Sequence, residues 1–99
     1  MMKFEMFVVI ADIKLKEGVE DEFKAWFSKA NETISQFSGF VSRRLLKAPD
    51  GHHRIIVEFE RKEDFVKLHE SQEHAKLHDT AVTYMESPPM PKVYDVLAS

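Results

Sequence analysis

The sequence contains no cysteine and no apolar run long enough to cross a membrane. The absence of cysteine excludes disulfides, thiolate metal sites, iron–sulfur clusters and a cysteine nucleophile, and it fits a reducing compartment. The longest apolar run, residues 6–11, is far shorter than the roughly 20 residues of a membrane-spanning helix. The first residues also lack the charged-then-apolar plan of a signal peptide. We therefore expect a cytoplasmic protein that does not interact with membranes.

The charge balance shows no large excess of either sign, because the net charge is −3 when the histidines are neutral. Such a chain would not be attracted to a phosphate backbone, so we expect no nucleic-acid partner. Neighbouring Arg43 and Arg44 must point to opposite faces of any strand, and we interpret them as solvated strand ends. The length of 99 residues and the hydrophobic content of 43% indicate a single globular domain, residues 1–99.

Alternating side chains predict a first strand over residues 4–16 that is apolar on both faces. One face carries Phe7, Val9, Ala11, Ile13 and Leu15, and the other carries Phe4, Met6, Val8 and Ile10. A strand of this kind lies in the middle of a sheet, with other elements covering each of its sides.

The remaining elements follow from their periods and their turn residues. Apolar residues at three- and four-residue steps predict a helix over 19–37, which Gly39 ends. Strands over 40–47 and 53–60 are joined by a turn containing proline and glycine at 49–51. A helical period returns over 62–85, and Ser71 divides it into two helices as an N-cap. A proline-rich connector over 87–91 precedes the last strand, 93–97, where Pro91 suits an edge position.

The order β-α-β-β-α-β predicts an α+β, ferredoxin-like fold, with an antiparallel sheet and helices on one face only. The other face, which bears the apolar side chains of residues 4, 6, 8 and 10, then needs a different cover. A second copy of the chain, related by a two-fold axis, is the simplest one. We therefore expect a homodimer.

Several motifs, in this order and spacing, make the chain resemble the antibiotic biosynthesis monooxygenase (ABM) family. They are Lys16-Glu17-Gly18-Val19-Glu20-Asp21-Glu22-Phe23 after a strand, Gly39-Phe40, and Phe65-x3-His69-x-Ser71-x2-His74-x3-His78. The resemblance covers nearly the whole chain. It implies a dimeric α+β barrel in which two sheets pack face to face.

The resemblance also implies a choice of activities. Similar proteins include cofactor-independent monooxygenases of quinols and polycyclic phenols, haem-degrading monooxygenases, and an isomerase of a phosphorylated sugar. Haem-degrading members use an Asn, a Trp and a His, and the matching positions here are Ala11, Leu68 and His78. Only the histidine matches, which argues against haem degradation and leaves simple haem binding as an alternative. The resemblance therefore implies no cofactor.

The candidate site lies where the helix over 72–85 faces the first strand. His74 and His78 share one helix face, and Ala11 on the strand leaves room opposite them for a small planar ligand. Further site residues are His69, Phe23, Trp26, Phe27, Leu68 and Leu77. A zinc site on His74 and His78 is disfavoured because Asp79 projects about 100° away from His78 around the helix. We predict no metal.

The leading hypothesis is a monooxygenase whose partners are a small quinol-like or phenolic compound and oxygen. His78 or His74, and in the family motif also His69, would remove the phenolic proton, since the pKa of histidine lies near neutrality. One alternative is an isomerase of a small, phosphorylated metabolite, with Arg43, Arg44 or Arg54 as the cationic group. The other is a non-catalytic protein that binds a small ligand or haem.

Overall fold

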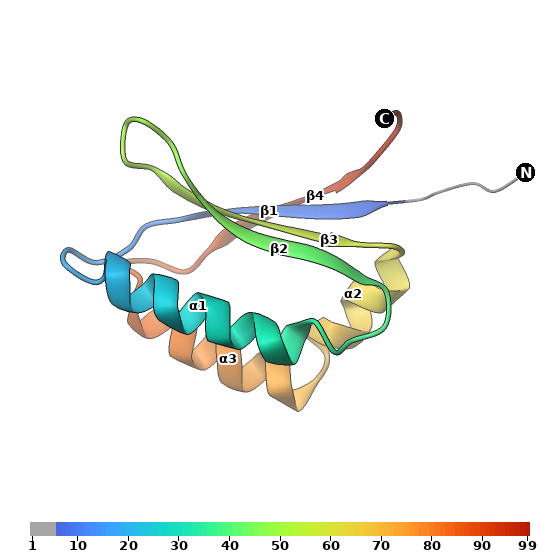
Figure 1. Ribbon diagram of the computed structural model, residues 1–99, viewed down its shortest axis with the longest axis horizontal. Helices are drawn as coiled ribbons and strands as arrows, with labels where there is room; N and C mark the ends of the chain where they lie inside the picture. The colour runs from blue at the N-terminus through green and yellow to red at the C-terminus, as the bar shows by residue number, and fades with distance from the viewer. Residues whose placement is uncertain (1–5) are drawn as a thin grey trace, which may run out of the picture.

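The computed structural model describes residues 6–99 as one antiparallel sheet with helices on one face (Figure 1). In chain order the elements are β1 (Phe7–Ile13), α1 (Glu20–Ile34), β2 (Phe40–Lys47), β3 (His53–Phe59), α2 (Lys62–His69), α3 (Gln72–Thr83) and β4 (Met90–Asp95). The predicted ferredoxin-like fold is therefore confirmed, with its second helical region divided in two. The predicted start of the first strand at Phe4 lies outside the described residues.

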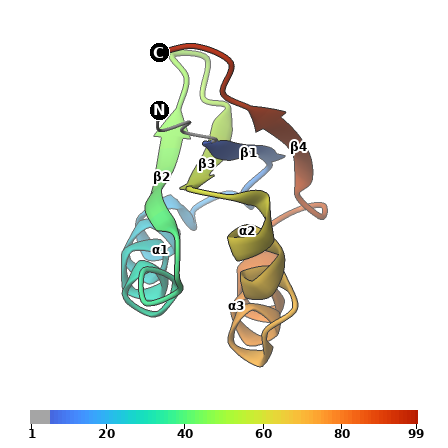
Figure 2. The ribbon, with the colours of Figure 1, turned by 90° about the vertical axis from the view of Figure 1, so that its right-hand side faces the viewer.

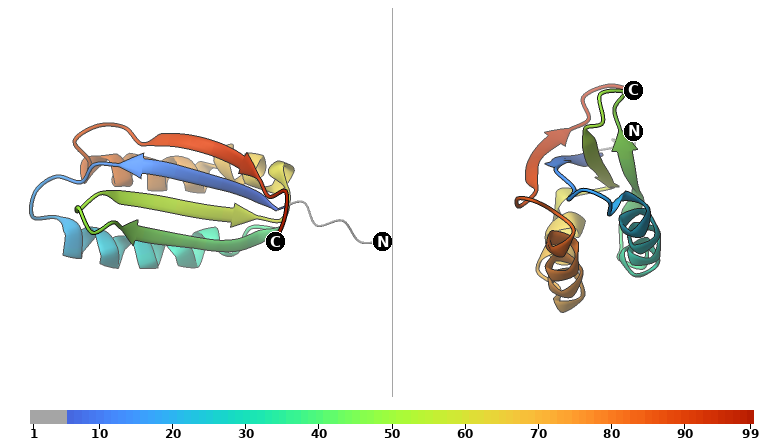
Figure 3. Two further views of the ribbon diagram at one scale, coloured as in Figure 1. Left: turned by 90° about the horizontal axis from the view of Figure 1, so that it is seen from above. Right: turned by 90° about the vertical axis from the view of Figure 1, so that its left-hand side faces the viewer.

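The sheet has the order β2-β3-β1-β4, so β1 is central and β4 forms an edge, as expected (Figure 3). β1 pairs with β3 from Phe7 opposite Phe59 to Ile13 opposite His53. The prediction for the last strand, 93–97, was displaced, since β4 already begins at Met90. Pro91 lies inside the strand, opposite Ala11, rather than at its entrance. An edge strand tolerates this because one of its sides has no ladder to complete.

The hydrophobic core lies between the sheet and the helices. The most buried side chains are those of Phe23 and Phe59, which expose 0% of their surface. Around them pack Phe7, Val9, Ile13, Phe27, Ile34, Ile55, Val57 and Leu68. The two-residue alternation of β1 and β3 and the three- to four-residue spacing of α1 thus bring their apolar sides together.

Local sequence explains where the helices begin and end. α1 starts with three acidic residues, which the positive end of the helix dipole favours. It ends at Ile34 rather than at residue 37, because the N–H groups of Gln36 and Phe37 donate to carbonyls three residues back. Gly39 follows with φ +79°, and its missing side chain leaves room for buried Asp64 of α2.

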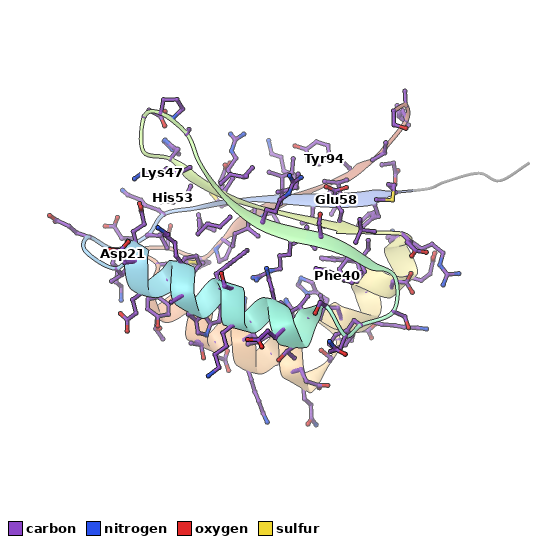
Figure 4. The ribbon with its side chains drawn as sticks, in the orientation of Figure 1. Asp21, Phe40, Lys47, His53, Glu58 and Tyr94 are labelled. Carbon is purple, nitrogen blue, oxygen red and sulfur yellow. The ribbon has the colours of Figure 1, made fainter. Side chains whose placement is uncertain are left out.

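The sheet face opposite the helices is partly apolar. Val8, Ile10 and Ile56 are half-buried on this face, and Tyr94 is 46% exposed. Figure 4 shows Tyr94 above the sheet and Phe40 on the side of the helices. Two ion pairs, Arg54–Asp12 and Arg44–Glu58, flank the apolar part. The sheet is not closed on itself, and no helix within residues 6–99 is long and apolar enough to span a bilayer.

Candidate functional site

A cavity of about 210 Å³ lies on the helix side of the sheet. Figure 2 shows α1 and the pair α2 and α3 as two separate walls below the strands. Val9, Ala11, Ile55 and Val57 line the cavity from the sheet, and Pro88 and Pro89 line it from the connector before β4. Most of the surface around the cavity is therefore apolar, as is typical of sites for small organic molecules.

The cavity gathers most of the residues that the sequence pointed to. All three candidate histidines line it, and so do Ala11, Trp26, Leu68 and Leu77. Two predicted wall residues lie elsewhere. Phe23 is fully enclosed in the core, where its ring packs against the rings of Trp26 and Tyr84. Phe27 is buried too, and its remaining surface contributes to a second groove between α1 and β2.

The three histidine rings form a row along the wall made by α2 and α3. The ring centroids of His69 and His74 are 4.2 Å apart, and those of His74 and His78 are 6.2 Å apart. Phe65 continues the row beyond His69 at 4.8 Å. Since His69 ends α2 and the other two lie on α3, the row depends on the angle between these helices.

Ser71 fixes the junction between these two helices. Its hydroxyl oxygen accepts the backbone N–H of His74 at 3.1 Å, and its hydroxyl donates to the carbonyl of Leu68 at 2.6 Å. The N-cap expected from the sequence is thus confirmed. One side chain therefore caps the start of α3 and connects it to the last turn of α2.

The environment favours the neutral form of the central histidine. Burial, followed by the nearby His69, His78 and Arg43, lowers the pKa of His74 to about 4. Burial and the neighbouring His78 also lower the pKa of His69. His74 is therefore uncharged at neutral pH, and one of its ring nitrogens carries a free lone pair. Such a group can accept a hydrogen bond or a proton from a ligand.

Arg43 is a site residue that the sequence analysis named only for the isomerase alternative, beside Arg44 and Arg54, and otherwise interpreted as a solvated strand end. It lies on the helix side of β2, opposite Val57, and it lines the cavity instead of facing solvent as a strand end. Its guanidinium donates to the side-chain oxygen of Asn31 at 2.7 Å and lies 4.0 Å from the ring centre of Phe27. The available signal for this inward orientation was the spacing of two residues between Arg43 and apolar Leu45, because residues two apart lie on the same face of a strand.

A second, larger groove of about 550 Å³ lies between α1 and β2. Three of its polar groups are paired with one another: Glu20 contacts Lys47 at 3.0 Å and His53 at 2.9 Å. Figure 4 shows Lys47 and His53 near the start of α1. Hydrogen bonds from Lys47 and then His53 lower the pKa of Glu20. Because these side chains satisfy one another, the histidine cavity is the better candidate site.

The histidine cavity is not built to hold a metal ion. No carboxylate side chain lines it, and the three imidazole rings lie side by side with interplanar angles of 35° and 21°. Within residues 6–99 no group of three or more His, Cys, Asp or Glu side chains is arranged so that it could hold a metal ion.

Comparisons with known proteins agree with this architecture. Residues 6–80 match the family model described as antibiotic biosynthesis monooxygenase. No curated protein matches the sequence. A protein from Nitrosomonas europaea named for that family is 18% identical, with TM-score 0.83 over 98% of this chain and 95% of its own. One from Bordetella bronchiseptica, also 18% identical, gives TM-score 0.83 over 94% of this chain and 98% of its own.

A third similar structure is SnoaB, a cofactor-independent oxygenase from Streptomyces nogalater. It is 14% identical, with TM-score 0.81 over 98% of this chain and 97% of its own. At such identities the structures establish a shared fold alone. The family match, in contrast, covers well over half of the sequence. The chain therefore belongs to the antibiotic biosynthesis monooxygenase family.

Proposed function

We propose that this protein is a monooxygenase that oxidises a small phenolic or quinol compound with oxygen and without a cofactor. The observation that carries the proposal is the neutral His74 imidazole in a largely apolar cavity. A base of this kind can take the proton of a bound phenol, and the apolar walls then keep water from the reactive anion. Membership of the family supports the oxygen chemistry.

The size of the cavity limits the substrate. A cavity of about 150 Å³ can enclose benzene, so 210 Å³ suits one substituted ring or a compact two-ring system. Trp26 and the row of imidazole rings provide flat surfaces for such a molecule.

The proposed reaction uses the substrate itself as the reductant. His74 accepts the phenolic proton, and the phenolate then transfers electrons to oxygen. One oxygen atom forms a new C=O bond at a ring carbon that loses its hydrogen. The other leaves as water with that hydrogen and the phenolic proton. The substrate supplies four electrons and becomes a quinone, so atoms and electrons balance without another reductant. His78 and His69 complete the polar side of the cavity as hydrogen-bonding groups.

Oxygen consumption with a panel of phenols and hydroquinones tests the proposal. We expect enzyme-dependent uptake with one- or two-ring compounds and a loss of at least about tenfold in His74→Ala, the lower part of the range for general-base catalysis. His78→Ala should reduce the rate less. His52→Ala is the control, because His52 lies on the exposed β2–β3 turn. Equal rates in all of these variants would exclude the histidine base, and equal turnover under nitrogen would indicate an isomerase.

We also propose that the protein is a homodimer that uses the sheet face opposite the helices. The half-buried Val8, Ile10 and Ile56 lie there with exposed Tyr94, and apolar burial is the main driving force of association. Light scattering should give twice the chain mass of 11.5 kDa. Ile10→Lys should yield monomers, whereas Lys76→Glu, on exposed α3 surface, should not. A wild-type monomer at micromolar concentration would refute this arrangement.

A further inference from the structure

Arg43 lies between the histidine cavity and the groove between α1 and β2, and it lines both of them. The side chain is largely buried, and this burial lowers its pKa to about 10, so the guanidinium is still charged at neutral pH. No carboxylate of residues 6–99 lies within ion-pair distance of Arg43, although most cationic side chains near the sheet have such partners. The charge is thus held in place without being neutralised.

The contacts of Arg43 leave much of its hydrogen-bonding capacity unused. A guanidinium has five N–H donors, and among the described residues only one hydrogen bond from it is formed, to Asn31. The face of the group packs on Phe27 at 4.0 Å, which orients it without satisfying its donors. Asn31 also donates to the backbone carbonyl of Arg43 at 3.0 Å, so the residue is fixed at both ends.

The remaining polar groups of the cavity do not compensate this charge. No acidic side chain lines the cavity, and its other ionisable groups are three histidines. The electric field of Arg43 reaches the cavity, because it contributes to the lowered pKa of His74 on the opposite wall. The site is therefore positive on one side, neutral and basic on the other, and apolar between them.

We propose that Arg43 binds an anionic group of the substrate, and that the cavity selects small hydroxyaryl carboxylates over neutral phenols. The carboxylate would accept two parallel N–H bonds from the guanidinium, a geometry that arginine forms especially well. The ring would then lie between the apolar strands and Trp26, with a hydroxyl directed toward the histidine row. The assignment of a hydroxyaryl substrate rests on the proposed monooxygenase function. The preference for an anionic ligand is a statement about binding and does not require turnover.

Neighbouring Arg44 provides a built-in comparison. It lies on the other face of the same strand, its side chain is 61% exposed, and it pairs with Glu58 at 3.3 Å. Arg44 is thus an ordinary surface cation with a partner. A substitution there removes the same charge from the chain without changing the cavity.

The test compares the binding of two probes that differ by one carboxylate, gentisate (2,5-dihydroxybenzoate) and hydroquinone, by calorimetry at pH 7. We expect wild-type protein to bind gentisate about tenfold to a hundredfold more tightly, the range for a charge-assisted hydrogen-bonded contact. Arg43→Gln should remove this preference and retain hydroquinone binding, whereas Arg44→Gln should keep both. Quenching of Trp26, the single tryptophan, reports that the probe occupies this cavity.

The possible results separate the two proposals. Equal affinity of the wild-type protein for both probes overturns the anion site, and so does an unchanged preference in Arg43→Gln. A clear preference without any oxygen uptake would leave the anion site standing and refute the monooxygenase. Should Arg43→Gln fail to fold, Arg43→Lys keeps the charge but loses the two-pronged contact, and we expect an intermediate preference. The wild-type comparison needs no variant.

Discussion

The buried His74 imidazole should make the stability of the folded protein depend on pH in a defined direction. Its pKa is about 4 in the folded state, against about 6.5 for an unperturbed histidine. As pH falls from 7 toward 4, the unfolded chain takes up a proton on this residue before the folded chain does. Protonation therefore favours the unfolded state, and stability is lost as the pH decreases.

The size of this effect follows from the two pKa values. Between pH 7 and pH 5, proton linkage at one group with these values removes up to about 1.8 kcal/mol of unfolding free energy. The ring of His74 is only half-buried, so solvent screening reduces the expected loss to about 1 kcal/mol. The lowered pKa of His69 acts in the same direction.

Urea unfolding at pH 7 and pH 5 measures this loss directly. The wild type should lose about 1 kcal/mol more between the two pH values than His74→Gln, which keeps a polar side chain of similar size but does not titrate. Thr80→Ala, on the exposed side of α3, removes no titratable group and should follow the wild type. Parallel losses in wild type and His74→Gln would refute the inference that the imidazole is held neutral by its surroundings.

Two further substitutions, Gly39→Ala and Ser71→Ala, test how the fold positions the site, and Gly18→Ala serves as a control for the first. In Gly39→Ala the new methyl group would lie only 2.8 Å from the Cβ of buried Asp64, and residue 39 would have to keep its positive φ. We expect the free energy of unfolding in urea to fall by about 3 kcal/mol. Gly18→Ala has positive φ but open space, and should lose only about 1 kcal/mol. Ser71→Ala removes the cap of α3, and we expect about 1 kcal/mol of destabilisation together with faster hydrogen exchange at the His74 amide; unchanged exchange would contradict the role of Ser71.

The fold could be predicted largely from sequence because its strongest patterns are local. The two-sided apolarity of β1 indicated a central strand, and Ser71 marked the division between α2 and α3. The last strand was predicted to begin at residue 93, after its actual start at Met90, because proline was interpreted as a strand boundary. At a sheet edge, however, a missing N–H does not prevent pairing, and Pro91 lies opposite Ala11 within β4.

The candidate site was harder to predict, because a cavity depends on which side chains of different elements leave space between them. Helical spacing placed Phe23 and Phe27 on the same side of α1 as Trp26, yet only Trp26 lies beside the cavity. Arg43 was interpreted mainly as a solvated strand end because a cation in a strand is usually solvated, and the sequence did not distinguish it from Arg44 and Arg54. Its inward position depends on Asn31 and Phe27 of α1, whose contacts with β2 cannot be inferred from the spacing of residues along the chain.

The cationic Arg43 and the neutral His74 of the cavity affect each other's role in the proposed reaction. Proton transfer from a phenol with pKa near 10 to a base with pKa about 4 is unfavourable by about six pKa units, or roughly 8 kcal/mol. Burial is the main cause of that low value, and Arg43 adds a smaller contribution, since a cation nearby opposes protonation of His74. A carboxylate bound to Arg43 would cancel this repulsion and raise the pKa of His74 in the complex. An anionic substrate would thus both bind more tightly and strengthen the base that activates it, so the carboxylate should increase kcat as well as affinity.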